Sequence, residues 1–463
     1  MPGLDSLQCF PVRAEGEDVI IKVEEEQLKN TKRKRHMAKY DPSKDSRVFV
    51  VIGGGAAGSA AVESVRASGF EGRLVWFMRE KTLPLDRIKL SKQFNSEPLR
   101  PAEFYQEFGI EYHIDTDVSL LDHEAKEVGY SHSNVFQKLK YDSILVCTGG
   151  SPMGLRLEGA RSENVYVLRT LEDAQKINKE VAANPKANVV VVGSNFIGME
   201  CAGSLVKSAS SVTVLARGAV PFKPFGDQIG TAMLKFFEKN GVVFRANSEP
   251  KQLKLNAEGT RVTSVVIADG TEIPADYVIC GVGVEIKSST AFVRNGENFL
   301  DASGAFKVDQ HLRAAPGLFA AGDNVIYPDP LYGNVRIEHW AVAGSMGKRA
   351  GANLVAEAKN QLTAYNTVPY FWTMNFGKGI RYTGHAHSWD EIIFDMEPNG
   401  LEVDTLKFIA YYVSKGKVVA VATIARDPMA TRCAEFLKWG KMPDPETIRA
   451  AIKEKGTTNH LFL

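Results

Sequence analysis

Two stretches of the chain share one hydrophobic pattern: an apolar run, a glycine-rich turn, a helix-like segment and a second apolar run. In the first stretch the apolar runs are 48–52 and 74–78, and small residues between them predict a helix to about Ser68. Continuous apolar runs of this length are typical of strands buried in a parallel sheet. The second stretch, 188–217, repeats the plan about 140 residues later. The pattern therefore predicts two β-α-β units.

The two ends of the chain follow other patterns. Near the C-terminus, the runs 406–413 and 417–422 flank Ser414-Lys415-Gly416, which predicts an antiparallel hairpin within an α+β domain. Near the N-terminus, 18–23 alternates like a strand and precedes the basic run Lys32-Arg33-Lys34-Arg35. We interpret that run as a solvated linker, because no aromatic residues lie among the charges. A targeting or nucleic-acid patch is the alternative.

The turn of the first unit, 53–58, has glycine at its first, third and sixth positions. Gly53 allows the tight turn, Gly55 lets the backbone approach a pyrophosphate, and Gly58 lets helix and strand pack closely. The phosphates would then lie at the positive end of the helix. Glu80, 22 residues past Gly58, is placed to accept hydrogen bonds from ribose hydroxyls. We therefore predict a dinucleotide site at this turn.

The corresponding turn of the second unit keeps the outer glycines, Gly193 and Gly198, but has Asn195 in the middle. A side chain there narrows the approach of phosphate. The strand that closes the unit ends in Leu215-Ala216-Arg217, so the strand-end acid is missing. An arginine accepts the 2′-phosphate that a carboxylate would repel, so one hypothesis is a preference for NADPH over NADH. The other is that Arg217 points to solvent.

A third constellation, 318–323, is a short apolar strand that ends in Gly322 and Asp323. By itself it is equally compatible with an ordinary strand end capped by an aspartate.

With 463 residues the chain is too long to fold around a single hydrophobic core. We predict an α/β fold with two Rossmann-like dinucleotide-binding domains, the second inserted in the first, and a C-terminal α+β domain. The predicted parts are an N-terminal segment or linker at 1–45, the first dinucleotide domain at 46–165 and 306–364, the second at 166–305, and the C-terminal domain at 365–463.

Composition narrows the function classes. Hydrophobic residues make up 44% and charged residues 24%, a balance typical of soluble globular proteins. The 56 Lys and Arg balance 55 Asp and Glu, so no global field favours nucleic acid. No apolar run reaches the roughly 18 residues of a membrane span. Five dispersed cysteines favour a reducing compartment, and we expect a cytoplasmic protein, with mitochondrial association left open.

The ordered motifs resemble those of the flavoprotein reductases with two dinucleotide domains, over about 47–435. More closely, the chain is similar to the branch that holds ferredoxin reductases of dioxygenase systems and apoptosis-inducing factors. Within it, 376–378, 381–384 and Asp427-Pro428 look most like the apoptosis-inducing factor 3 type. The motifs that carry the branch resemblance are Leu83-Pro84-Leu85-Asp86-Arg87, Leu90-Ser91-Lys92, Thr148-Gly149, Leu168-Arg169-Thr170, Arg336-Ile337-Glu338-His339-Trp340 and Pro369-Tyr370-Phe371-Trp372-Thr373.

The resemblance implies FAD in the first domain and NADPH or NADH as electron donor in the second. Asp323 would hold the ribityl chain, and Lys92 would lie beside flavin N5 and pair with Glu200, both as catalytic residues. Trp340 and Trp372 would pack near the ring system, although tryptophan is more often a core residue. The implied cofactor-binding residues are Gly53, Gly55, Ala57, Gly58, Glu80, Arg87, Lys92, Val118, Thr148, Gly149, Arg169, Gly193, Phe196, Ile197, Gly198, Arg217, Gly283, Asp323, Trp340 and Trp372.

The chain departs from the family pattern in several places. Leu85 and Ile88 replace a usual tyrosine and proline, and most changes fall on the pyridine-nucleotide side. Members of the apoptosis-inducing factor 3 type normally carry an N-terminal Rieske domain. The first 23 residues of this chain resemble only the last strands of such a domain and contain no C-x-H or C-x-x-H ligand pair. No cluster has metal-ligand spacing. The stretch 87–93, which would lie beside the flavin, has no cysteine, and this disfavours disulfide and peroxide reductases. We interpret Cys147, on a buried strand, as a core packing residue and not as a redox-active one.

We therefore expect an FAD-dependent NAD(P)H oxidoreductase. Its electrons would pass to an iron–sulfur, haem or quinone acceptor, and an electron-carrier protein and a homodimer are the partners that we consider. The alternative is a redox-sensing signalling flavoprotein like the apoptosis-inducing factors. A flavin-binding scaffold with an inactive nucleotide site, suggested by Asn195, is a third reading.

Overall fold

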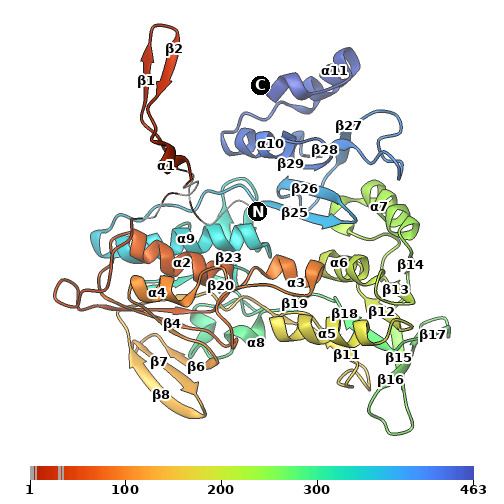
Figure 1. Ribbon diagram of the computed structural model, residues 1–463, viewed down its shortest axis with the longest axis horizontal. Helices are drawn as coiled ribbons and strands as arrows, with labels where there is room; N and C mark the ends of the chain where they lie inside the picture. Colours follow the sequence, from red (N-terminus) through yellow and green to blue (C-terminus); the bar gives the residue numbers. More distant parts are fainter. Residues whose placement is uncertain (1–4, 6–7, 30–32, 34–35, 463) are drawn as a thin grey trace.

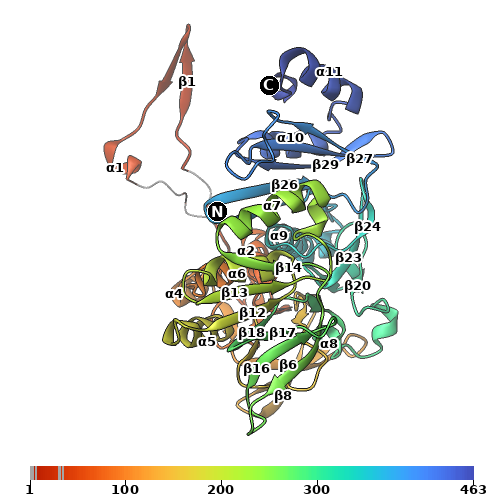
Figure 2. The same cartoon turned by 90° about the vertical axis from the view of Figure 1, so that its right-hand side faces the viewer.

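The computed structural model describes residues 5, 8–29, 33 and 36–462. Most of the basic run at 32–35 thus lies outside the described residues. The described N-terminal residues form a hairpin of β1 (Val12–Glu15) and β2 (Asp18–Ile21), followed by α1 (Glu25–Leu28). This arm stands away from the body, beside the C-terminal helices in Figure 1, and Figure 2 shows the same separation from the side. The strand predicted at 18–23 ends at Ile21.

The first large sheet contains six strands in the order β21-β22-β9-β3-β4-β5. Neighbouring strands pair parallel, except that β21 is antiparallel to β22. Residues 318–320 thus pair with 144–146, far earlier in the chain, which joins two sequence segments in one sheet. The bounds are β3 (Val48–Ile52), β4 (Arg73–Phe77), β5 (Ile110–His113), β9 (Ser143–Val146), β21 (Arg313–Ala315) and β22 (Leu318–Ala320).

Two helices cover one face of this sheet, α2 (Ala56–Ala67) and α9 (Trp340–Ala356), and they lie side by side in Figures 1 and 2. Glycines allow the close approach. A Cβ on Gly347 would lie 2.0 Å from the Ala57 carbonyl oxygen, and one on Gly351 would lie 2.6 Å from that of Ala61. The buried core under these helices includes Phe49, Trp76 and Phe319. Close helix packing therefore holds the start of α2 against the carboxyl ends of the strands.

The second large sheet has five parallel strands in the order β11-β18-β12-β13-β14. Valines 189–192 of β12 are almost fully buried, as expected for a strand in the middle of a parallel sheet. The bounds are β11 (Val165–Val167), α5 (Leu171–Ala183), β12 (Asn188–Val192), α6 (Phe196–Leu205), β13 (Ser211–Leu215), α7 (Asp227–Lys239), β14 (Val242–Arg245) and β18 (Tyr277–Cys280).

The C-terminal part is an antiparallel sheet in the order β25-β26-β29-β28-β27, with α10 and α11. The predicted hairpin is present with shifted bounds: its first strand begins two residues later and ends one residue later than predicted, and its second strand runs two residues further. Leu406 has a positive φ of 33° and precedes the strand, and Ser414 pairs with Lys417 inside it. Positive φ at Lys415 and Gly416 gives the two-residue turn that suits the twist of the strands. The bounds are β25 (Tyr370–Asn375), β26 (Lys378–Gly384), β27 (Glu391–Asp395), β28 (Phe408–Ser414), β29 (Lys417–Ile424), α10 (Met429–Lys438) and α11 (Pro445–Lys455).

Smaller elements complete the described chain. Three small sheets pair as β6-β7-β8, β15-β16-β17 and β20-β23-β24, and β10 pairs with β19. Their bounds, with those of the short helices, are α3 (Leu90–Gln93), α4 (Ala102–Glu107), β6 (Thr116–Asp122), β7 (Glu127–His132), β8 (Val135–Lys140), β10 (Ser151–Pro152), β15 (Pro250–Leu255), β16 (Val262–Ile267), β17 (Glu272–Pro274), β19 (Val284–Glu285), α8 (Lys287–Thr290), β20 (Phe306–Lys307), β23 (Val325–Asp329) and β24 (Gly333–Val335).

Candidate functional site

One continuous cavity of about 1650 Å³ connects the glycine turns of the two β-α-β units. Residues 52–57 line one end and 192–197 line another, and Trp340 and Trp372 lie on its wall. Of the residues predicted from sequence, Gly58, Lys92 and Gly198 lie behind the lining. The others line it: Gly53, Gly55, Ala57, Glu80, Arg87, Val118, Thr148, Gly149, Arg169, Gly193, Phe196, Ile197, Glu200, Arg217, Gly283, Asp323, Trp340 and Trp372.

The first turn is built for close approach by a ligand. Gly53 has φ of 117°, and a Cβ on Gly58 would lie 1.9 Å from the Gly53 carbonyl oxygen. A Cβ on Gly55 would meet no protein atom within 4 Å, so the absence of a side chain there serves the cavity rather than the fold. Gly55 caps α2 without a side-chain hydrogen bond, and the first turn has no acidic residue. The N–H groups at this helix end are thus available to a diphosphate.

The second turn repeats this geometry with one difference. Gly193 has φ of 110°, and a Cβ on Gly198 would lie 2.0 Å from the Gly193 carbonyl oxygen. Asn195 occupies the position of Gly55 and begins α6, but its side chain makes no capping hydrogen bond. The asparagine is therefore not needed to hold the helix, and its side chain takes space at the end where phosphate would bind.

Replacing Asn195 by glycine is expected to tighten binding of NADH by roughly 1 kcal/mol, about fivefold. The change removes atoms from the phosphate approach, and glycine at a helix N-cap costs only a few tenths of a kcal/mol. Isothermal titration of the oxidised protein with ADP-ribose measures the effect without redox chemistry. Weaker binding by the variant would show instead that the asparagine contributes a contact to the nucleotide.

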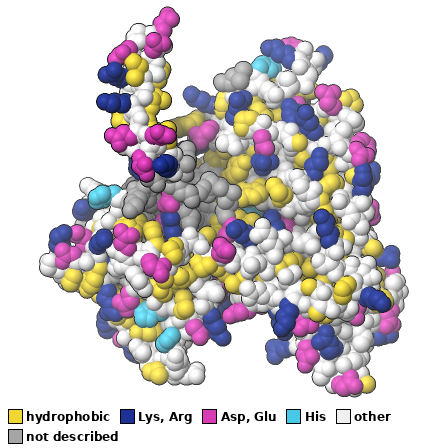
Figure 3. Space-filling view, in the orientation of Figure 1, with side chains coloured by type: hydrophobic (Ala, Val, Ile, Leu, Met, Phe, Trp, Pro, Cys, Tyr) yellow, Lys and Arg dark blue, Asp and Glu magenta, His cyan; other side chains and the backbone are white. Residues whose placement is uncertain are grey.

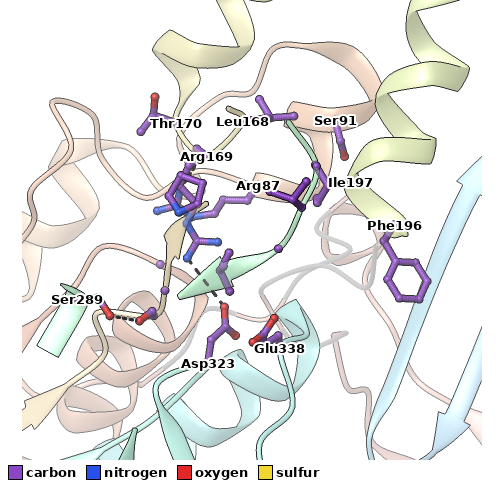
Figure 4. Close-up of a pocket in the computed structure, with 18 of the residues that line it drawn as sticks. Arg87, Ser91, Leu168, Arg169, Thr170, Phe196, Ile197, Ser289, Asp323 and Glu338 are labelled. Carbon is purple, nitrogen blue, oxygen red and sulfur yellow. Dashed lines mark hydrogen bonds and ion pairs between the residues drawn. The ribbon is translucent and has the colours of Figure 1, made fainter. Parts of the chain in front are cut away.

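Charged side chains from four segments meet in the cavity. Arg87 Nη2 donates to Glu80 Oε1, and Arg87 Nη1 donates to the Arg169 carbonyl oxygen at 2.6 Å. Arg169 Nη2 lies 3.9 Å from Asp323 Oδ2, and Figure 4 shows these side chains converging. Burial and the nearby Arg87 lower the pKa of Arg169, whereas burial raises the pKa of Asp323. The group offers both donors and acceptors to a polar ligand.

Lys92 and Glu200 form an ion pair with 2.7 Å between Lys92 Nζ and Glu200 Oε1, in which the carboxylate is buried and the lysine side chain is 21% exposed. Ser91 Oγ donates to Glu200 Oε2 at 2.5 Å, and Thr373 Oγ1 donates to Glu200 Oε1 at 2.7 Å. Glu200 is 5% exposed, so these contacts compensate for loss of water. The carboxylate joins α3, α6 and β25. Nothing in the spacing along the chain signalled Ser91 or Thr373, because they lie 109 and 173 residues from Glu200.

Aromatic rings form the wall between α6, the start of α9 and β25. The rings of His339 and Phe371 are stacked with centroids 3.8 Å apart, and Phe196 meets Phe371 edge-on at 5.2 Å. Burial lowers the pKa of His339 to about 4, so the imidazole is neutral above pH 5. His339 and Phe371 belong to motifs recognised in the sequence, but neither had been assigned to the site.

Arg217 lies at the other end of the cavity, where it does not stand alone. Its Nε donates to Glu249 Oε1 at 2.5 Å, and both residues line the cavity. Its side chain is nevertheless 90% exposed. Sequence reasoning missed Glu249, which lies 32 residues away and beyond β14.

The described part of the chain bears on two other classes of function. It contains no group of three or more His, Cys, Asp or Glu side chains arranged to hold a metal ion. No helix within it is long and apolar enough to cross a membrane. Cys147 and Cys280 line the cavity, but burial raises the pKa of both thiols, that of Cys280 to about 11. Such thiols are weak nucleophiles at neutral pH.

The fold is that of a protein with two Rossmann-like dinucleotide-binding domains, and one cavity connects their glycine turns. The chain belongs to the pyridine nucleotide-disulphide oxidoreductase family, whose model matches residues 47–347. It is 36% identical over 452 residues to apoptosis-inducing factor 3 of Mus musculus, covering 95% of this chain and 72% of the relative. It is 27% identical over 390 residues to putidaredoxin reductase of Pseudomonas putida, covering 81% and 88%.

Among solved structures, the chain is similar to a covalent complex of putidaredoxin reductase with putidaredoxin. The TM-score is 0.78 at 24% identity, and the alignment covers 88% of this chain and 99% of that one. The predicted fold class, the branch of the family and the use of FAD with NAD(P)H are confirmed. The bare turn at Gly55 and the uncapped start of α2 fit FAD. The protein is an FAD-dependent NAD(P)H oxidoreductase.

Proposed function

We propose that this protein takes a hydride from NAD(P)H at one end of the cavity and passes single electrons to an iron–sulfur carrier protein. The observation that carries the proposal is the continuity of the cavity, which connects the turn at Gly53 with the turn at Gly193. A nicotinamide ring and a flavin ring bound there would share one space. Bound FAD supplies the conversion from a two-electron donor to a one-electron acceptor.

The chain's own residues would bind, orient and shield. The two glycine turns and helix ends hold the phosphates, and the arginines with Asp323 hold the polar linker of FAD. Glu200, held by Ser91 and Thr373, would fix the ammonium group of Lys92 next to the cavity. Rings of His339 and Phe371 exclude water from the same region.

The acceptor class is supported by two relatives. One is a putidaredoxin reductase, and one solved structure of similar fold holds its putidaredoxin partner. On the face shown in Figure 3, basic and acidic side chains are interspersed, so docking would rely on a local surface rather than on a global field. An iron–sulfur protein is therefore proposed ahead of haem proteins and quinones.

Anaerobic titration of the purified protein with NADH and with NADPH tests the first half of the proposal. Bleaching of the flavin absorption at about one equivalent of either nucleotide is the expected result, because one hydride reduces one flavin. Mixing the reduced protein with at least two equivalents of an oxidised two-iron ferredoxin, each of which accepts one electron, should then restore the flavin spectrum within seconds. A bound flavin that neither nucleotide reduces would refute the reductase function and favour a scaffold.

The second candidate is a redox-sensing signalling flavoprotein, favoured by the 36% identity to apoptosis-inducing factor 3. Reoxidation separates the two candidates: a reductase returns quickly to the oxidised state with a carrier, whereas a sensor holds a long-lived reduced complex with the nucleotide. The same mixing experiment therefore decides between them.

We also propose a cytoplasmic location, with mitochondrial association as the alternative, because Cys147, Cys201, Cys280 and Cys433 are buried thiols. A homodimer remains a prediction for sedimentation analysis.

A further inference from the structure

The second nucleotide unit obtains a carboxylate from an unexpected place. A strand-end acid would stand where the chain has Ala216, directly after β13. The segment that follows β14 runs back along this strand end: Ser248 N donates to the Ala216 carbonyl oxygen at 2.7 Å, and Asn247 N donates to that of Gly218 at 3.2 Å. These bonds bring Glu249 to the strand end, where the adenosine ribose of a pyridine nucleotide binds in such units.

Glu249 engages the arginine that would otherwise receive a 2′-phosphate. Glu249 Oε1 accepts from Arg217 Nε, and the carboxyl and guanidinium groups both border the cavity. Lys223, another cation on this wall, is paired in the same way with Asp227 at 2.5 Å. Each of these two cations already has a carboxylate partner, and of the two carboxylates Glu249 is the one that borders the cavity.

We infer that Glu249 determines the choice of dinucleotide and makes NADH the preferred donor, an inference that rests on the proposed function. A carboxylate accepts hydrogen bonds from the ribose hydroxyls of NADH. It repels a 2′-phosphate, which carries a charge of about −1.5 to −2 at neutral pH. The preference is opposite to the one that Arg217 alone suggests, because the arginine already has a partner.

A 2′-phosphate and Glu249 would compete for Arg217, but this competition alone does not set the preference between NADH and NADPH. An exposed ion pair contributes about 0–1 kcal/mol, so a 2′-phosphate is able to displace Glu249 from the arginine. Displacement leaves the carboxylate next to the phosphate, however, and like charges brought together are unfavourable. The favourable contact of NADPH with Arg217 is thus offset by the repulsion between its 2′-phosphate and Glu249.

Equilibrium binding of two non-reducible fragments tests the inference: ADP-ribose and its 2′-phosphate, titrated into the flavin-loaded protein. The wild type is expected to bind the 2′-phosphorylated fragment no more tightly than ADP-ribose. Glu249→Gln should tighten the 2′-phosphorylated fragment by about fivefold to tenfold and leave ADP-ribose equal or weaker. The gain should shrink as salt is raised from 0.02 M to 0.5 M, because both groups are exposed.

Glu272→Gln is the matched control, since Glu272 forms an exposed ion pair with Lys254 in the neighbouring sheet and lies outside the cavity lining. It should change neither affinity. A wild type that binds the 2′-phosphorylated fragment tenfold more tightly would overturn the inference, and so would a Glu249→Gln variant with an unchanged ratio. Fragment binding is independent of electron transfer, so a failure of flavin reduction bears on the proposed function alone.

Discussion

Replacing Lys92 by methionine is expected to lower the free energy of unfolding by about 3 kcal/mol and to slow flavin reduction by NAD(P)H roughly 10²–10³-fold. The stability loss follows from Glu200, a carboxylate 5% exposed that would lose its cation. Ser91 and Thr373 would still donate to it, which places the loss at the low end of the range for broken buried pairs. The rate loss follows from the removal of the ammonium group that would stabilise the anionic reduced flavin.

The double variant Lys92→Met with Glu200→Gln separates the two effects. A glutamine leaves no unpaired charge in the interior, so the double variant should regain most of the lost free energy of unfolding, as measured with urea. Flavin reduction by NADH, followed by stopped flow, should stay slow. Lys89→Met is the matched control, because this lysine lies three residues away and is exposed, whereas Glu200 pairs with Lys92. If the double variant reduced its flavin at the wild-type rate, the ion pair would have a structural role only.

Gly55→Val is expected to weaken FAD binding about a hundredfold while the protein still folds. No protein atom lies within 4 Å of a Cβ at this position, and its extended backbone, with φ of −84°, accommodates a branched residue. The added methyl groups would occupy the approach of the diphosphate to the start of α2, and overpacking of about 2.7 kcal/mol corresponds to that factor. Flavin absorbance relative to protein absorbance after purification measures the loss.

Two comparisons make this result specific. Gly344→Ala in α9 also meets no atom within 4 Å and lies outside the cavity lining, so it should retain full FAD. Gly58→Ala should fail differently, because its Cβ would lie 1.9 Å from the Gly53 carbonyl oxygen and would push α2 off its strand. A Gly55→Val protein that carries stoichiometric FAD would show that the diphosphate binds elsewhere.

The order of local elements was predictable because it depends on short-range rules. The segments 48–52 and 188–192 coincide with β3 and β12, since four or five consecutive apolar residues before a glycine turn form a buried parallel strand. Strand ends were less certain. The strand predicted from Leu406 begins at Phe408, because the positive φ at Leu406 turns the chain before it, and no pattern of hydrophobicity reports that angle.

By itself, the sequence determined that there are two β-α-β units with glycine turns, because the size of a side chain and its spacing along the chain are local properties. Only the tertiary structure decided which distant groups meet: Thr373 and Ser91 on Glu200, and Glu249 on Arg217. Such contacts depend on how separate sheets pack and on how the segment after β14 runs back along β13. Charge at a site is the sum over all groups that surround it, and for Arg217 that sum reverses what the residue alone suggests.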